Sequence, residues 1–305
     1  MSNKIRYAPP KASAMLEALR GLGYSTADAL ADIIDNSISA GASKVWINFN
    51  WDEDAAAFIS ILDNGSGMSD PELEAAMRLG DKSPLDQRSK DDLGRFGMGL
   101  KTASFSQCRS LTVTSRKQGA SDSCLRWDLD EIAKRDDGAW VLFEGVSPGS
   151  EARISPLEEQ LSGTLVLWEK LDRIVTDGFN ADHFLKMIDG VETKLSMIFH
   201  RLLEGRKPLL TLYINKVAIK PWDPFLIDHP AKPWNSPVEK RWTLSGDIEV
   251  ECHVLPHKDM LSLGEYENAA GPDGWNSQQG FYVYRNKRLL LAGGWLGLQG
   301  ERMSV

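Results

Sequence analysis

The sequence predicts an α+β protein, in which a mostly antiparallel sheet carries helices on one face and a smaller α/β region follows. Apolar residues recur at helical spacing over 25–42 and again over 182–203, which is typical of amphipathic helices. Between them, apolar and polar residues alternate over 45–51, which indicates a half-buried strand. With 305 residues, the chain is long enough for two domains.

The first of these helices is expected to begin after Ser25, because Asp28 stands three residues later and the two can form a capping box. Gly41 is expected to end it. Asp28, Asp32 and Asn36 recur four residues apart and line one face without a basic partner. Taken alone, such a face favours contact with solvent.

The strand pattern over 45–51 is followed by an acidic turn and a second strand pattern over 58–63, so the two predict a hairpin. Ser69 and Glu72 form a second capping box, with a proline in the first turn. They predict a helix over 71–79.

The first domain is expected to span 1–172 and to contain four more strands, over 111–114, 125–129, 140–143 and 165–168. A second domain, 173–305, is expected to begin with the long helix. It would continue with a hairpin that turns at Asn215 and with strands over 248–254 and 281–291.

Composition excludes some classes of protein. No apolar run approaches the roughly 18 residues of a membrane-spanning helix, and the start of the chain has no apolar signal region. Three cysteines show no metal-binding spacing, which favours reduced thiols in the cytoplasm. The net charge of -8 and the lack of a basic cluster speak against nucleic-acid binding by this region itself.

Two glycine-rich stretches follow the polar-faced helix. DNGSGM, at 63–68, comes directly after a strand, and GRFGMGLKTAS, at 94–104, precedes a helical pattern. Glycines let a backbone approach a ligand closely, and the free N–H groups at the start of a helix attract phosphate. Either stretch alone is weak evidence, since an Asn-Gly pair is also a common hairpin turn. Together with the polar-faced helix, in this order and at these gaps, they are strong evidence for a site that binds a phosphate-bearing ligand.

Together, these stretches resemble motifs of the GHKL ATPase superfamily, which contains gyrase, the large heat-shock chaperones, histidine kinases, MutL and MORC proteins. ADIIDNSISAGA is similar to the first motif, DNGSGM to the second, GRFGMGLKTAS to the third, and SGT at 162–164 to the fourth. The third is most similar to the form found in MORC-like bacterial ATPases. The resemblance implies a two-layer α/β sandwich of the Bergerat type, followed by a smaller transducer-like domain.

The resemblance also implies roles for single residues. Asp32 would be the general base, where the family usually has the longer glutamate. Asn36 would bind Mg²⁺ through its amide oxygen. Asp63 would accept a hydrogen bond from the adenine amino group, and Thr164 would offer a hydroxyl to the same edge of the ring. Met68 would pack on the purine.

The glycine turns would approach the nucleotide with their backbones. Gly65 and Gly67 belong to the adenine side of the site. The backbone N–H groups around the phosphates would come from the third motif, namely Gly94, Phe96, Gly97, Met98, Gly99 and Leu100. Lys101 would add a positive charge with a catalytic role, and either Lys216 or Lys287 would reach the terminal phosphate from the transducer-like domain.

By resemblance, the protein is a Mg²⁺-dependent ATPase with slow turnover, limited by closure of a lid at 80–93 and by formation of an ATP-dependent homodimer. Residues 1–12 would be either a disordered tail or a strap that crosses to the partner subunit. Aspartate at position 32 leaves open a nucleotide-binding scaffold with little hydrolysis. A DNA-processing role like that of MutL or gyrase is a further alternative, with DNA or a protein client bound through regions beyond this chain.

Overall fold

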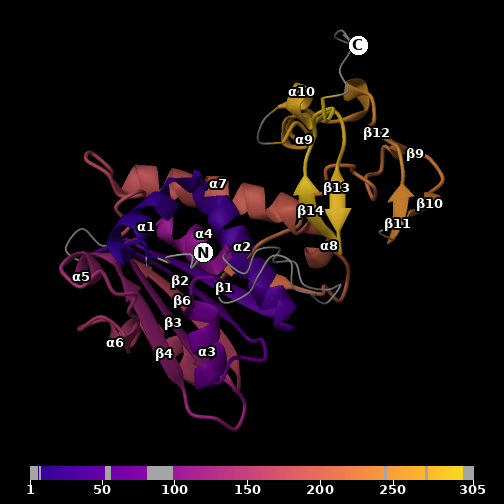
Figure 1. Ribbon diagram of the computed structural model, residues 1–305. Coiled ribbons are helices and arrows are strands. Elements are labelled where there is room, and N and C mark those ends of the chain that lie inside the picture. Colours follow the sequence, from indigo (N-terminus) through magenta and orange to yellow (C-terminus); the bar gives the residue numbers. More distant parts are fainter. Residues whose placement is uncertain are drawn as a thin grey trace, which may run out of the picture. The chain divides into compact units, whose positions relative to one another are not determined.

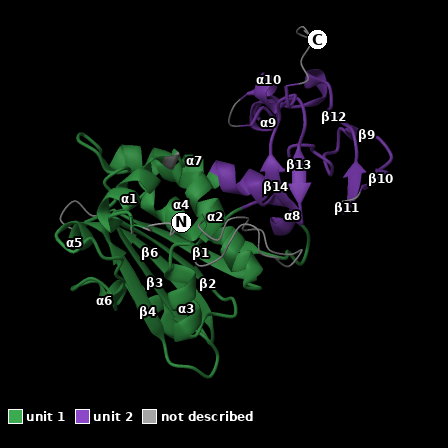
Figure 2. Cartoon of the chain, viewed as in Figure 1, with its two compact units in different colours: residues 1–192, 205–219 green, residues 193–204, 220–305 purple. Residues whose placement is uncertain are grey.

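A computed structural model describes residues 6, 8–51, 56–80, 99–243, 246–271 and 274–297 (Figure 1). The chain divides into two compact units, one formed by residues 1–192 and 205–219 and the other by residues 193–204 and 220–305 (Figure 2). These units are defined by packing. The division into functional domains at 1–172 and 173–305 stays a prediction.

The first unit is built on one eight-stranded sheet, in the order β5-β4-β3-β6-β2-β1-β7-β8. Its strands are β1 (Lys44–Asn50), β2 (Phe58–Asp63), β3 (Ser110–Arg116), β4 (Ser123–Asp128), β5 (Phe143–Glu144), β6 (Gly163–Glu169), β7 (Thr211–Ile214) and β8 (Val217–Ala218). Neighbouring strands are antiparallel, except that β1 and β7 are parallel. The sheet is therefore mixed.

Helices pack against this sheet, and the α+β class is confirmed. They are α1 (Ala12–Leu19), η1 (Arg20–Leu22), α2 (Thr26–Ser39), α3 (Asp70–Met77), α4 (Gly99–Phe105), α5 (Leu129–Ala133), α6 (Glu151–Ile154), η2 (Ser155–Glu159) and the first part of α7 (Ala181–Ile198). α2 and α4 pack against each other over the sheet (Figure 1). None of the described helices is long and apolar enough to cross a membrane.

The predicted helix caps are confirmed. The Oγ of Ser25 accepts the N–H of Asp28 at 3.2 Å at the start of α2, and Gly41 follows the end of this helix with a φ of 74°. At the start of α3, the N–H of Ser69 donates to Glu72 Oε2 at 2.7 Å. Because such caps depend on neighbours in the sequence, they could be found without the tertiary structure.

Register along β2 decides which way the site faces. Leu62 packs with a cluster that includes Leu157 of η2, so α6 and η2 cover part of one face of the sheet. Side chains alternate along a strand, and Asp63 therefore points to the opposite face. There it meets Ser37 of α2, whose hydroxyl donates to it at 2.9 Å.

The hairpin at Asn215 and Lys216 is confirmed, and both residues have the positive φ of a two-residue turn, 45° and 72°. From its position in the sequence, this hairpin is expected to belong to the second domain. In the structure, however, β7 pairs with β1 and extends the sheet of the first unit. Trp46 stacks on Tyr213, with ring centroids 5.8 Å apart. Without β7, the edge of β1 would leave its backbone groups unpaired.

The second unit contains small sheets and short helices. Its elements after α7 are α8 (His200–Leu203), β9 (Trp234–Asn235), β10 (Glu239–Thr243), β11 (Gly246–Val250), β12 (His253–Val254), η3 (Lys258–Met260), α9 (Leu263–Ala269), α10 (Trp275–Gln278), β13 (Val283–Arg285) and β14 (Arg288–Leu291). The strands form the pairs β10-β11, β12-β9 and β13-β14.

The prediction of one continuous helix over 182–203 is wrong at Phe199. This residue leaves the helical conformation, with φ of -106° and ψ of 9°, and separates α7 from α8. The break buries the Phe199 ring, which lies 5.7 Å from the guanidinium of Arg288. Burial of an aromatic ring against a cation offsets the interruption of the helix.

Candidate functional site

Asp63 ends β2, and the residue is only 6% exposed. Oδ1 accepts the N–H groups of Gly65 at 2.8 Å and Thr164 at 3.3 Å, and Oδ2 accepts the hydroxyl of Ser37 at 2.9 Å. Burial raises the pKa of this carboxyl, although the three hydrogen bonds act in the opposite direction. A carboxylate has about four acceptor sites, so it retains capacity for one more donor, such as a ligand amino group.

The turn after β2 needs glycine for its packing. Gly67 has a φ of 64°, and a Cβ there would lie 1.8 Å from the carbonyl oxygen of Arg116. Gly163, at the start of β6, has a φ of 153°, and its Cβ would lie 2.1 Å from the carbonyl oxygen of Asp63. A Cβ on Gly65 would meet that of Ala40 at 2.9 Å. Larger residues would push apart the strand ends that hold Asp63.

Met68 and Thr164 are joined through Ser115 on β3. The Oγ of Ser115 accepts the N–H of Met68 at 2.8 Å and lies 2.9 Å from Thr164 Oγ1. Both Met68 and Thr164 are half-buried, whereas Ser115 is buried. The fold thus gathers the second and fourth motifs around Asp63, and their contact with adenine stays a prediction.

Asp32 and Asn36 lie one turn apart on α2. Asp32 is half-buried, and its Oδ2 accepts the phenol of Tyr24 at 3.1 Å. A Cβ on Gly99, the first residue of α4, would lie 3.5 Å from the same oxygen. The Asp32 carboxylate therefore faces the beginning of the third-motif helix, and its role as a base stays a prediction.

Asn36 is exposed and offers one amide oxygen for a metal ion. Within the part of the chain that the structure describes, no three His, Cys, Asp or Glu residues come together as a metal site. The residues fit Mg²⁺ only in its usual nucleotide-bound form, where phosphates and water supply most of the ligands.

Lys101 is buried, with 2% of its surface exposed. Its Nζ donates to the carbonyl oxygens of Ala76 at 2.7 Å and Arg78 at 2.9 Å, at the carboxyl end of α3. A cation is favourable at this end of a helix, where carbonyl groups lack partners within the helix. Lys101 therefore has a structural role at the end of α3. Its contact with phosphate stays a prediction.

Part of the third motif cannot be placed. Gly94, Phe96, Gly97, Met98 and the expected lid after Gly80 lie outside the described residues. Leu100 lies half-buried on α4. Lys216 and Lys287 are both exposed in hairpin turns, and the choice between them stays a prediction.

Three residues around the site were not expected. Ser37 occupies the apolar stripe of α2, and a hydroxyl in such a stripe signals a buried hydrogen bond. Ser115 and Tyr24 carry no comparable signal, because their partners are distant in the sequence or lie on another element. Tertiary contacts alone identify them.

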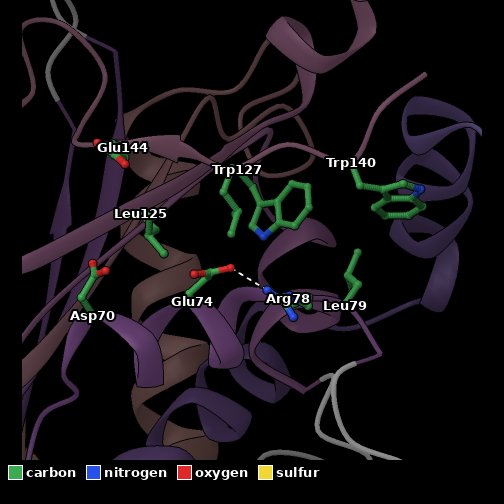
Figure 3. A pocket seen from close by; sticks show the side chains of 9 residues that line it. Asp70, Glu74, Arg78, Leu79, Leu125, Trp127, Trp140 and Glu144 are labelled. Atoms are coloured by element: carbon green, nitrogen blue, oxygen red, sulfur yellow. Dashed lines mark hydrogen bonds and ion pairs between the residues drawn. The ribbon is translucent and has the colours of Figure 1, made fainter. Parts of the chain in front are cut away.

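A separate cavity of about 430 Å³ lies beside α3 and β4 (Figure 3). It is lined by Asp70, Glu74, Arg78, Leu79, Leu125, Trp127, Trp140, Leu142 and Glu144. None of the predicted site residues that the structure describes is among them. Trp127, which lines the cavity, donates its Nε1–H to the carbonyl oxygen of Met77, at the end of α3, at 3.0 Å.

These features define an α+β fold in which a buried carboxylate at a strand end lies beside a polar-faced helix. Residues 24–164 match the family of histidine kinase-, DNA gyrase B- and HSP90-like ATPases. This region is therefore a GHKL domain, as its motifs predict.

Curated relatives include both MutL and MORC proteins. The DNA mismatch repair protein MutL of Shewanella loihica is 35% identical over 123 residues, which cover 39% of this chain and 19% of MutL. MutL of Rhizorhabdus wittichii is 28% identical over 132 residues, which cover 43% of this chain and 21% of that MutL. ATPase morc-1 of Caenorhabditis elegans is 30% identical over 118 residues, which cover 38% of this chain and 13% of morc-1. The chain thus spans about a fifth or less of the length of these relatives.

Proposed function

We propose that this protein binds ATP with Mg²⁺, hydrolyses it slowly, and uses the nucleotide cycle to drive dimerisation and conformational change, as a MORC-like ATPase in the cytoplasm. The observation that carries the proposal is the buried Asp63 carboxylate, which has acceptor capacity left and lies beside the helix with Asp32 and Asn36. Membership of residues 24–164 in an ATPase family supports it.

In this proposal, Asp63 accepts a hydrogen bond from the adenine amino group, Met68 packs on the ring, and Thr164 binds its edge directly or through water. Backbone N–H groups of the third motif and the charge of Lys101 hold the phosphates. Asn36 would hold Mg²⁺ together with phosphate oxygens and water, and the metal would neutralise phosphate charge.

Asp32 acts on the attacking water. Its carboxylate orients the water and takes its proton as the oxygen attacks the terminal phosphorus; the bond from that phosphorus to the oxygen of ADP then breaks. The side chain is one methylene shorter than the glutamate usual in the family, so its reach to the water is reduced. We therefore expect hydrolysis to be slow and binding to be unaffected.

Phosphate release by the purified protein in Mg²⁺ and ATP tests the proposal. Asp32→Asn should lower the rate about a hundredfold or more, since general bases contribute about that much. Asp70→Asn, which removes an exposed carboxylate at the start of α3, should not change it. If wild type shows no magnesium-dependent nucleotide binding, the proposal is wrong.

The shorter base at position 32 favours one second candidate, a nucleotide-binding scaffold with little hydrolysis. In that case ATP would bind, but wild type and Asp32→Asn would release phosphate at the same low rate.

The similarity to MutL also suggests a DNA-processing role through regions beyond this chain. Salt-sensitive retention of circular DNA by the ATP-bound full-length protein would support that role, and its absence would remove it.

A further inference from the structure

Tyr24 lies between the two helices that carry the first and third motifs. It precedes the Ser25 cap of α2, and its phenol donates to Asp32 Oδ2 at 3.1 Å. The side chain of Thr102, on α4, lies close enough to the same phenol to act on its pKa, which it lowers. The phenol thus donates to α2 and faces α4.

The main chain of Tyr24 is held as well. Its carbonyl oxygen accepts the Nε2 of Gln107 at 3.2 Å, and the Oε1 of Gln107 accepts the hydroxyl of Thr26 at 2.8 Å. Gln107 is buried, with 3% of its surface exposed. Since the backbone and the phenol are each fixed, the direction of the hydrogen bond to Asp32 is fixed too.

We propose that Tyr24 is a positioning residue for Asp32, which holds the short carboxylate in the orientation that hydrolysis needs. This inference rests on the proposed function, because it takes Asp32 as the base. With its Oδ2 held by Tyr24, the carboxylate cannot rotate freely, so Oδ1 keeps one direction. Aspartate has less reach than glutamate, and a fixed orientation matters more for it.

The chemistry of the phenol suits this task. Burial, followed by the nearby Asp32 charge, raises the pKa of Tyr24, so the phenol stays protonated and donates at neutral pH. A neutral donor orients the carboxylate without bringing a positive charge beside it. A lysine or arginine in the same place would pair with the base and make it less able to take a proton.

The test compares Tyr24→Phe, which removes only the phenol oxygen, with wild type in single-turnover and steady-state ATP hydrolysis. Loss of a hydrogen bond to a charged group should lower kcat about tenfold to a hundredfold. The Kd for ATP should stay within about twofold, because the interaction acts on the base and not on binding.

Two controls separate positioning from a general loss of structure. Tyr213→Phe makes the same chemical change on β7, where the ring stacks on Trp46, and should leave kcat unchanged. In an Asp32→Asn background, Tyr24→Phe should cause no further loss, since the residue acts through Asp32.

Each outcome decides a different point. Absence of ATP turnover by wild type would remove the proposed function, and the inference with it. Turnover that depends on Asp32 but is unchanged in Tyr24→Phe would overturn the inference alone. An equal loss with and without the Asp32 carboxylate, or a loss confined to Kd, would likewise overturn it.

Discussion

Asp63 carries a negative charge into a buried position, and its hydrogen bonds do not fully compensate for this, since its pKa is raised. The folded state then binds a proton more tightly than the unfolded state does. The contribution of Asp63 to stability is most favourable below the unfolded pKa and is lost as pH rises through the raised folded pKa. The ionised carboxylate therefore destabilises the nucleotide-free protein at neutral pH.

We expect Asp63→Asn to be at least as stable as wild type at neutral pH, because it removes the buried charge and keeps an oxygen for the N–H groups of Gly65 and Thr164. The difference should shrink as pH falls through the raised pKa of Asp63, because protonation removes the charge of the wild-type carboxyl. Urea unfolding of the nucleotide-free proteins at several pH values measures it. If Asp63→Asn were clearly less stable than wild type at neutral pH, the negative charge of Asp63 would instead stabilise the turn.

Gly67→Ala should destabilise the fold by about 3 kcal/mol or more, for two reasons. The added Cβ would clash with the carbonyl oxygen of Arg116, and the positive φ is unfavourable for alanine. Gly119→Ala is the matched control. Its φ is 81°, but no atom lies within 4 Å of the added Cβ, so the cost should be only about 1 kcal/mol. Thermal or urea unfolding of both variants measures the difference, and equal losses would contradict the packing argument.

Among single residues, those whose roles depend on their neighbours in the sequence could be predicted. Asp63, Gly65 and Gly67 follow one another in a motif, and the fold places them in one turn. Tyr24 was not predicted, since its link to Asp32 depends on the turn before α2 and its link to Thr102 on the packing of two helices.

At the scale of elements, the carboxyl end of α3 is held by side chains from two other elements. Lys101 of α4 donates to the carbonyls of Ala76 and Arg78, and Trp127 of β4 donates to that of Met77. These are carbonyls that a helix cannot satisfy by itself. The end of α3 is therefore fixed at the point where the chain leads towards the third motif.

Lys101→Met should lower the free energy of unfolding by about 1–3 kcal/mol, because it leaves these partly buried carbonyls without the Lys101 donor. Lys117→Met, which removes an exposed ion pair with Glu72, should cost much less, because solvent screens such pairs. Urea unfolding measures stability, and ATP titration of the folded proteins measures binding. Unchanged stability with lost ATP affinity would show that Lys101 serves the phosphates alone.

Elements with local signals could be predicted, and elements with distant partners could not. The caps of α2 and α3 depend on residues three positions apart. By contrast, the end of α7 depends on burial of Phe199, and the pairing of β7 with β1 joins strands far apart in the chain. Alternation predicts a strand but does not specify its neighbour.

At the scale of the whole molecule, the proposal requires nucleotide to change the state of association. A ligand can shift an equilibrium only if it binds one state more tightly than the other. We expect the protein to be monomeric without nucleotide and dimeric with a non-hydrolysable ATP analogue and Mg²⁺. Light scattering after gel filtration measures the mass, with Asp63→Asn as the control that should stay monomeric. A mass that does not respond to saturating nucleotide would contradict dimerisation but not binding.

Equilibrium binding of ATP to the nucleotide-free protein tests the central claim most directly. Calorimetric titration in the presence of Mg²⁺ should show one site per chain in wild type. Asp63→Asn should lose most of the affinity, because its amide presents a donor to the adenine amino group in place of an acceptor. Asp137→Asn, which changes an exposed aspartate paired with Arg135, should bind as wild type does. Equal affinity of wild type and a correctly folded Asp63→Asn would contradict the account.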